Sequence, residues 1–130
     1  MSQSDERMTE LRELFFESAQ ELLQALNEEA LKLEKHPGDS EIVRSLRRIV
    51  HTLKGDAAAC GYRELSEVAH QLEDALALES AAAHATLAEV AFAAADLFSA
   101  MLNAYRKRAK LPSREPVSYT HLTLPTILLV

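Results

Sequence analysis

His51 lies in a segment where cationic and small side chains recur at helical spacing. At about 100° of rotation per residue, a helix over residues 40–60 would turn His51 away from an apolar stripe of Ile42, Leu46, Ile49, Leu53 and Ala57. The outer face around the histidine would then carry Arg44, Arg47, Arg48, Lys54, Gly55 and Ala58. An accessible imidazole is a nucleophile near neutral pH, and neighbouring cations favour an anionic group beside it. The segment therefore predicts chemistry with a phosphate at His51.

Two residues one helical turn beyond His51 fit this chemistry. Lys54 follows the histidine by one turn, so its ammonium would reach the oxygens of a phosphoryl group on the ring. Gly55 is unfavourable in mid-helix, by about 1 kcal/mol relative to alanine. We interpret it as clearance that lets a partner's active site approach the imidazole, because a side chain at position 55 would obstruct that approach.

A second histidine and a carboxylate lie close together in the next apolar segment. His70 and Glu73 would be neighbours on a helix over residues 62–79. If this helix packs antiparallel to the preceding one, with the chain turning at Gly61, Glu73 could lean towards His51. A carboxylate that accepts a hydrogen bond from one ring nitrogen fixes the tautomer and leaves the other nitrogen as the nucleophile. We therefore predict that Glu73, with His70 beside it, orients His51.

The same residues admit other interpretations. His51 and its arginines would form an ordinary solvated face if the histidine had no function. A metal-binding bundle would use His51, His70 and Glu73 as ligands, although carboxylate sites in bundles draw on inward-facing residues. A non-catalytic helical adaptor would need none of this chemistry, and it would leave the combination of His51, Lys54 and Gly55 unexplained.

Four amphipathic segments are predicted to position these residues, at about 8–34, 40–60, 62–79 and 86–108. Asp39 or Ser40 would cap the second helix at its start, and Gly61 would cap it at its end. The fourth helix is predicted to open with a capping box at Thr86-Leu87-Ala88-Glu89. Aromatic residues are only 5% of the chain, and alanine and leucine dominate. These patterns predict an all-α fold, an antiparallel four-helix bundle.

The apolar stripes of the other three segments give a predicted core. The first stripe contains Met8, Leu11, Phe15, Ala19, Leu22, Leu26, Ala30 and Leu33. The third contains Leu65, Val68, Ala69, Leu72 and Leu76. The fourth contains Leu87, Val90, Ala91, Ala94, Leu97, Phe98, Met101 and Tyr105.

The length of 130 residues suits one domain, which we predict over residues 8–109. Residues 110–130 form a tail that Pro112, Pro116 and Pro125 interrupt and that has no helical periodicity. We predict that this tail is disordered or not native to the domain.

Composition excludes several classes of function. A net charge of -6 argues against a nucleic-acid partner. The three glycines do not cluster into a phosphate-binding loop, so we expect no ATP-binding core in this chain and no cofactor. The single cysteine, Cys60, rules out an internal disulfide and fits a reducing compartment. Without a secretory signal or an evident run of about 20 apolar residues, we expect a cytoplasmic protein with no membrane contact.

The run His51-Thr52-Leu53-Lys54-Gly55, followed by small residues and Gly61, resembles the histidine phosphotransfer (HPt) motif. The run Ala69-His70-Gln71-Leu72-Glu73-Asp74 resembles the second motif of that family, which lies on the next helix. Residues 15–23 look like the family's first helix. Over about residues 10–105, the chain is similar to the amino-terminal phosphotransfer domain of CheA-type chemotaxis histidine kinases.

This resemblance implies that His51 is phosphorylated, with supporting roles for Lys54, His70 and Glu73. It also implies two partners, the ATP-binding domain of a histidine kinase and the receiver domain of a response regulator, whose aspartate takes the phosphoryl group. CheA-type domains carry a fifth helix after the fourth. Residues 112–130 show no such helix in their pattern, which is a departure from the family.

Overall fold

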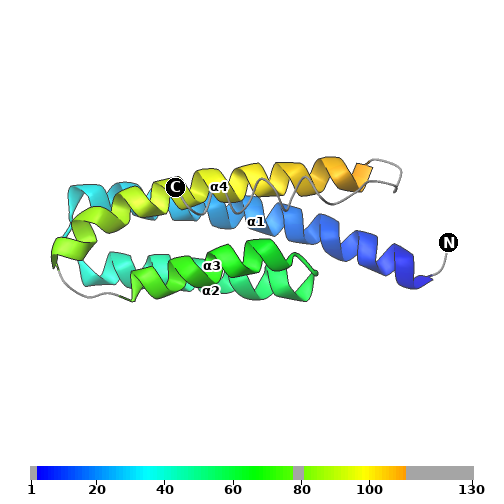
Figure 1. The fold of residues 1–130 in the computed structure, drawn as a ribbon, viewed down its shortest axis with the longest axis horizontal. Coiled ribbons are helices and arrows are strands. Elements are labelled where there is room, and N and C mark those ends of the chain that lie inside the picture. Colours follow the sequence, from blue (N-terminus) through cyan, green and yellow to red (C-terminus); the bar gives the residue numbers. More distant parts are fainter. Residues whose placement is uncertain (1–2, 78–80, 111–130) are drawn as a thin grey trace.

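The protein, described here from a computed structural model over residues 3–77 and 81–110, consists in these residues of four helices (Figure 1). They are α1 (Gln3–Lys35), α2 (Ser40–Ala59), α3 (Arg63–Leu76) and α4 (Ala81–Lys110). Successive helices run in opposite directions, which confirms the predicted all-α antiparallel four-helix bundle. The domain limits stay a prediction, and apart from Lys110 the predicted tail lies outside the described residues.

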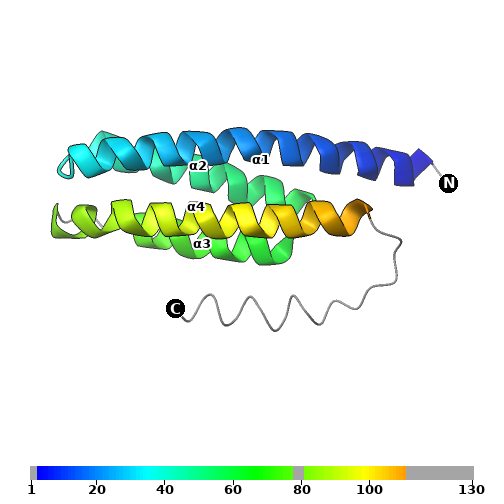
Figure 2. The ribbon, with the colours of Figure 1, turned by 90° about the horizontal axis from the view of Figure 1, so that it is seen from above.

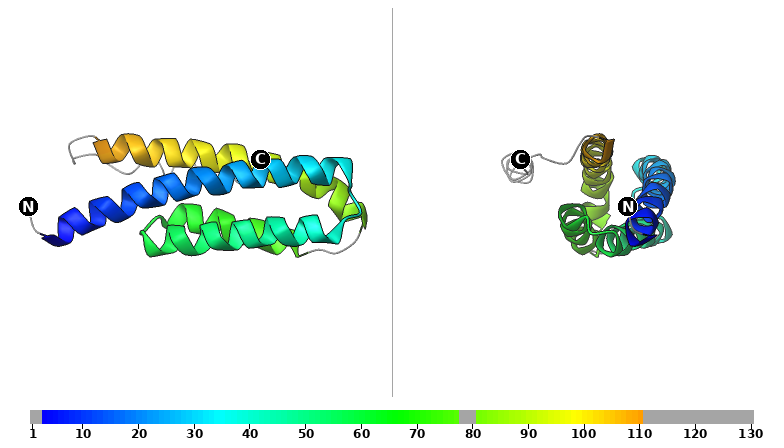
Figure 3. Two further views of the ribbon diagram at one scale, coloured as in Figure 1. Left: turned by 180° about the vertical axis from the view of Figure 1, so that it is seen from behind. Right: turned by 90° about the vertical axis from the view of Figure 1, so that its right-hand side faces the viewer.

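The bundle has two layers, one formed by α1 and α4 and the other by α2 and α3 (Figures 1 and 2). Each helix packs on two others, and the end-on view places α2 diagonally opposite α4 (Figure 3). The upper layer is longer, because α1 has 33 residues and α2 has 20. At about 1.5 Å per residue, the start of α1 and the end of α4 therefore extend past the turn that joins α2 to α3.

The two ends of α2 are capped by local hydrogen bonds. The Asp39 carboxylate accepts from the backbone N–H of Glu41 at 2.9 Å, which confirms one of the two predicted N-caps. At the other end Gly61 has a φ of 84°, a left-handed conformation that favours glycine. Gly61 N–H donates to the carbonyl of Ala58 and Tyr62 N–H to that of Ala57, the Schellman pattern. The predicted C-cap glycine is thus confirmed.

This turn is anchored by an aromatic cluster. Tyr62, the residue after Gly61, stacks on Phe15 with ring centroids 5.1 Å apart and on Tyr105 at 4.4 Å. The cluster joins α1, α4 and the α2–α3 turn at one end of the bundle. Burial raises the pKa of Tyr105, and its hydroxyl donates a long hydrogen bond of 3.4 Å to Glu64. The α2–α3 pair is thereby fixed against the longer layer.

The core confirms the third predicted stripe completely, because Leu65, Val68, Ala69, Leu72 and Leu76 are all buried. In α1 the prediction was wrong for Met8 and Leu11, which are 39% and 51% exposed. Leu11 lies beside the end of α2, where it lines a surface groove with Cys60 instead of entering the core, and Met8 lies about one helical turn nearer the start of α1. Phe16 and Leu23 are buried in α1, although the prediction omitted them.

Smaller corrections concern α2 and α4. Val50 is buried in α2, whereas the predicted Ile49 is only half-buried. In α4, Val90 is exposed, Ala94 and Leu97 are half-buried, and the buried positions include Ala88, Ala95 and Leu102. The predicted capping box at Thr86 is also wrong, because α4 already begins at Ala81. Alanine is the strongest helix former, so the alanine-rich run before Thr86 continues the helix.

Candidate functional site

His51 projects from the middle of α2, on the side opposite the core. Its side chain is 67% exposed, whereas Val50, one residue before it, and Leu53, two residues after it, are fully buried. The burial of Leu46, Leu53 and Ala57 fixes the rotation of α2 about its own axis. The imidazole is therefore held on a well-packed helix while remaining open to a partner.

Glu73 of α3 links His51 to Lys54. One carboxylate oxygen, Oε2, lies 2.8 Å from Nδ1 of His51, and the other, Oε1, accepts from Nζ of Lys54 at 2.5 Å. An ionised carboxylate only accepts hydrogen bonds, so Nδ1 is the protonated nitrogen. Nε2 then carries the lone pair of the neutral ring. The geometry thus leaves Nε2 as the nucleophilic atom.

The charge of Glu73 is maintained by these contacts. The hydrogen bond from the Lys54 ammonium lowers the pKa of the Glu73 carboxyl most, and the hydrogen bond to His51 lowers it further. Partial burial opposes them but does not prevail. Glu73 is therefore a carboxylate at neutral pH and can stabilise positive charge on the His51 ring.

Ser66 is a part of this arrangement that the sequence reasoning missed. Its hydroxyl donates to the backbone carbonyl of Lys54 at 3.1 Å, which joins α3 to α2 at a second point. Ser66 and Glu73 lie two helical turns apart on the same face of α3. The seven-residue spacing of Ser66 and Glu73 indicates that they share a face of α3, but it does not show that the hydroxyl would meet the Lys54 carbonyl.

His70 and Gly55 are placed differently from Glu73. His70 is 55% exposed, and its Nε2 lies 3.7 Å from Asp74, so within the described residues its ionic contact is along its own helix and not with His51. Gly55 is exposed, and a Cβ added there would meet no atom within 4 Å. Packing inside the domain does not require a glycine at position 55, which is compatible with the predicted clearance.

A metal site would need a different arrangement. Lys54 directs its ammonium at Glu73, where a metal ion would have to bind. In residues 3–77 and 81–110 no group of three His, Cys, Asp or Glu side chains is suited to hold a metal. The roles predicted for His51, Lys54, Gly55, His70 and Glu73 remain predictions at this point.

Comparison with known protein families gives a match to the Hpt domain over residues 10–108. The chain belongs to the Hpt domain family. Hpt domains are phosphotransfer carriers of two-component systems, and the four-helix architecture agrees with this assignment. The suspected resemblance is therefore confirmed.

The curated relatives of this Hpt domain include chemotaxis proteins named CheA. The protein from Listeria monocytogenes is 40% identical over 68 residues, which cover 52% of this chain and 11% of the relative. The Bacillus subtilis protein is 41% identical over 69 residues, covering 53% and 10%. The Cereibacter sphaeroides protein is 34% identical over 122 residues, covering 89% and 17%. The chain thus spans about a tenth of the first two relatives. No solved structure matches it significantly.

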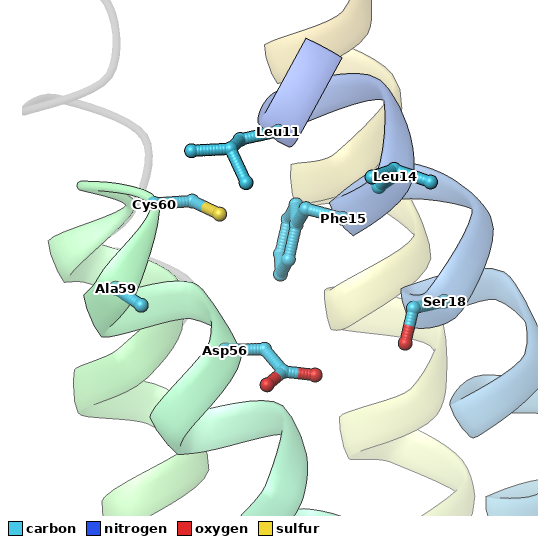
Figure 4. A pocket seen from close by; sticks show the side chains of 7 residues that line it. All are labelled: Leu11, Leu14, Phe15, Ser18, Asp56, Ala59 and Cys60. Carbon is cyan, nitrogen blue, oxygen red and sulfur yellow. The ribbon is translucent and has the colours of Figure 1, made fainter. Parts of the chain in front are cut away.

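The Hpt domain also has a groove between α1 and α2, of about 210 Å³ (Figure 4). It is lined by Leu11, Leu14, Phe15, Ser18, Asp56, Ala59 and Cys60. Burial, and secondarily the Asp56 carboxylate, raises the pKa of the Cys60 thiol, which therefore stays protonated. None of His51, Lys54 and Glu73 lines this groove, so it is separate from the histidine site.

One stretch of α4, Thr86–Arg108, is long and apolar enough to span a membrane by length and composition alone, which differs from the prediction that the chain contains no such stretch. Its apolar residues include Leu87, Phe98 and Leu102, which are buried in the bundle. Packing in the core accounts for these residues, and 39% of the apolar window in this stretch is buried in the bundle.

Proposed function

We propose that this Hpt domain carries a phosphoryl group on Nε2 of His51, receiving it from the ATP-binding domain of a histidine kinase and passing it to a receiver aspartate. The observation that carries the proposal is the pairing of Nδ1 with Glu73, because it leaves Nε2 free and exposed. The CheA relatives support the kinase as donor. A reaction with ATP and the reduced Cys60 suit the cytoplasm.

The first step forms one bond and breaks one. The Nε2 lone pair attacks the γ-phosphorus of ATP, a P–N bond forms, and the P–O bond to the leaving ADP breaks. The ring keeps its Nδ1 proton and becomes cationic. Glu73, which accepts that proton in a hydrogen bond, stabilises the positive charge.

Lys54 is placed to assist once the phosphoryl group has arrived. Its ammonium is bound to the same carboxylate as the His51 ring, so it lies close to the ring and carries a charge opposite to that of the phosphoryl oxygens. In the second step a receiver carboxylate attacks phosphorus, the P–N bond breaks, and His51 returns to the neutral Nδ1–H form. No proton has to enter or leave the ring in the complete cycle.

Phosphorylation of the purified domain by the kinase region of the Bacillus subtilis CheA relative tests the proposal. With labelled ATP we expect a label that is labile in acid and stable in base, and phosphorus–nitrogen NMR should place it on Nε2. His51→Gln should abolish the label while changing stability by no more than about 0.5 kcal/mol, because the position is exposed.

His70→Gln is the matched control, since His70 is also exposed and lies on the adjacent helix. It should retain the label. A label that survives in His51→Gln, or a phosphoryl group found on Nδ1, would contradict the proposal. A domain that takes no label from any kinase would instead be the non-catalytic adaptor.

A further inference from the structure

The exposed face of α2 carries three arginines on the N-terminal side of His51, namely Arg44, Arg47 and Arg48, here called the arginine strip. Arg47 and Arg48 precede the histidine by about one helical turn, and Arg44 by about two. Arg44 is 65% exposed, Arg48 is exposed and Arg47 is half-buried. The strip and His51 therefore form one continuous surface along α2.

Two of these arginines form no ion pair among the residues that the structure describes. Arg44 donates to Glu41 at 2.8 Å, an exposed pair on one helix that contributes little to stability. Arg47 and Arg48 have no carboxylate within ion-pair distance in the part of the chain that the structure describes. Their charges are available to another molecule.

The chain around the strip is acidic. The net charge is -6, and α3 contributes Glu64, Glu67, Glu73 and Asp74 against the single cation Arg63. Within residues 3–77 and 81–110, none of these carboxylates pairs with Arg47 or Arg48 beside the histidine. A local positive surface on an acidic protein selects for a partner with a negative surface and repels positive ones.

We infer that the arginine strip is the docking contact for an acidic surface on the receiver that accepts the phosphoryl group, an inference that rests on the proposed function. The receiver must bring an ionised aspartate to a phosphoryl group that is itself negative, so the approach is repulsive unless cations offset it. Phosphoryl transfer generally uses Mg²⁺, which carboxylates bind, so an acceptor site of this kind is acidic. Arginine forks bind carboxylates with two parallel hydrogen bonds.

The length of the strip favours a protein surface over a bound nucleotide. At about 1.5 Å per residue, Arg44 lies about 10 Å along α2 from His51, beyond the reach of a phosphoryl group on the ring. A footprint of that length fits a macromolecule that covers α2. Charge complementarity there would raise the rate of encounter, an effect that salt suppresses.

The test compares two double variants with the same change in net charge. Arg47→Glu with Arg48→Glu reverses the strip, and Arg63→Glu with Lys107→Glu reverses two exposed cations elsewhere, on α3 and on α4. Each protein is loaded with phosphoramidate, a small phosphoryl donor that needs no kinase. A panel of purified single-domain receivers is first screened with the wild-type domain. The receiver that takes the phosphoryl group fastest is used for all variants.

The second-order rate constant for transfer is measured at low and at high salt. We expect the strip variant to lose about tenfold or more at low salt and to recover most of that loss when salt screens the charges. The control should stay within about twofold of wild type. If the strip variant loads poorly because half-buried Arg47 is disturbed, Arg48→Gln replaces it, with an expected loss of about threefold.

Equal transfer rates for strip variant and wild type would overturn the inference and leave the proposed function intact. An equal loss in the control would also overturn it, because net charge and not the strip would be responsible. A loss confined to phosphorylation by the kinase with ATP would assign the strip to the donor side and likewise overturn it. Failure of the loaded wild-type domain to transfer to any receiver would overturn the proposed function itself.

Discussion

Removing the carboxylate of Glu73 should slow phosphorylation of His51 by about 5- to 30-fold. Glu73→Ala deletes the acceptor that holds the Nδ1 proton and the partner of the Lys54 ammonium. A hydrogen bond to a charged group contributes about 1.5–3 kcal/mol. His51 is 67% exposed, so solvent screening reduces its share to about 1–2 kcal/mol. That energy corresponds to a factor of about 5–30, provided that the ring needs this tautomer to react.

The assay is the initial rate of label transfer from ATP with a fixed amount of kinase, together with nitrogen NMR of the His51 ring. Asp74→Ala is the control, because Asp74 is the next residue of α3 and contacts His70 instead. We expect the ring of wild type and of Asp74→Ala to carry its proton on Nδ1, and that of Glu73→Ala to shift towards Nε2. A rate for Glu73→Ala within twofold of wild type, with an unchanged ring tautomer, would refute the reasoning.

Three further predictions concern Gly55, Leu53 and Glu73. Gly55→Ala should stabilise α2 by about 0.5–1 kcal/mol in denaturant melts, because alanine is the better helix former. Gly55→Leu should slow phosphorylation by the kinase but not loading with phosphoramidate, and a normal kinase rate for this variant would disprove the clearance argument. Leu53→Ala, at a fully buried position, should cost about 2–5 kcal/mol, and Leu14→Ala, at a position 60% exposed, should cost far less; similar losses would mean that the core is wrongly assigned. The pKa of Glu73 is lowered in the folded state, so the carboxylate stabilises the fold above about pH 4.3 and loses this effect as the pH falls further. The melting-temperature advantage of wild type over Glu73→Gln should therefore shrink between about pH 5 and pH 3, and a constant difference would argue against the paired carboxylate.

Periodicity predicted the helices and most of the core because each apolar stripe reports the face that a helix buries. It failed for Met8 and Leu11, since a stripe does not reveal how completely the neighbouring helices cover the end of a helix. It also failed at Phe16 and Leu23, because α1 packs on two helices and its buried face is wider than a single stripe. The start of α4 was misplaced because a capping pattern competes with the high helix propensity of the alanines before it.

The candidate site was predictable where its residues lie on one helix. The spacing of His51, Lys54 and Gly55 follows from the helical period alone. The approach of Glu73 to His51 depended on an assumed antiparallel turn at Gly61, which the structure contains. That Glu73 is shared with Lys54 and that Ser66 bonds to the Lys54 carbonyl both depend on the rotation of α3 against α2. One-dimensional spacing does not specify that rotation.

The exposure of His51 has a consequence for the lifetime of the signal. With 67% of the His51 side chain open to solvent, a phosphoryl group on Nε2 would itself be accessible to water. The persistence of the modified form would then depend on the intrinsic hydrolysis of the P–N bond and on how often acceptors collide with the domain. Acceptor concentration and the rate of hydrolysis would together set the lifetime of the phosphorylated form.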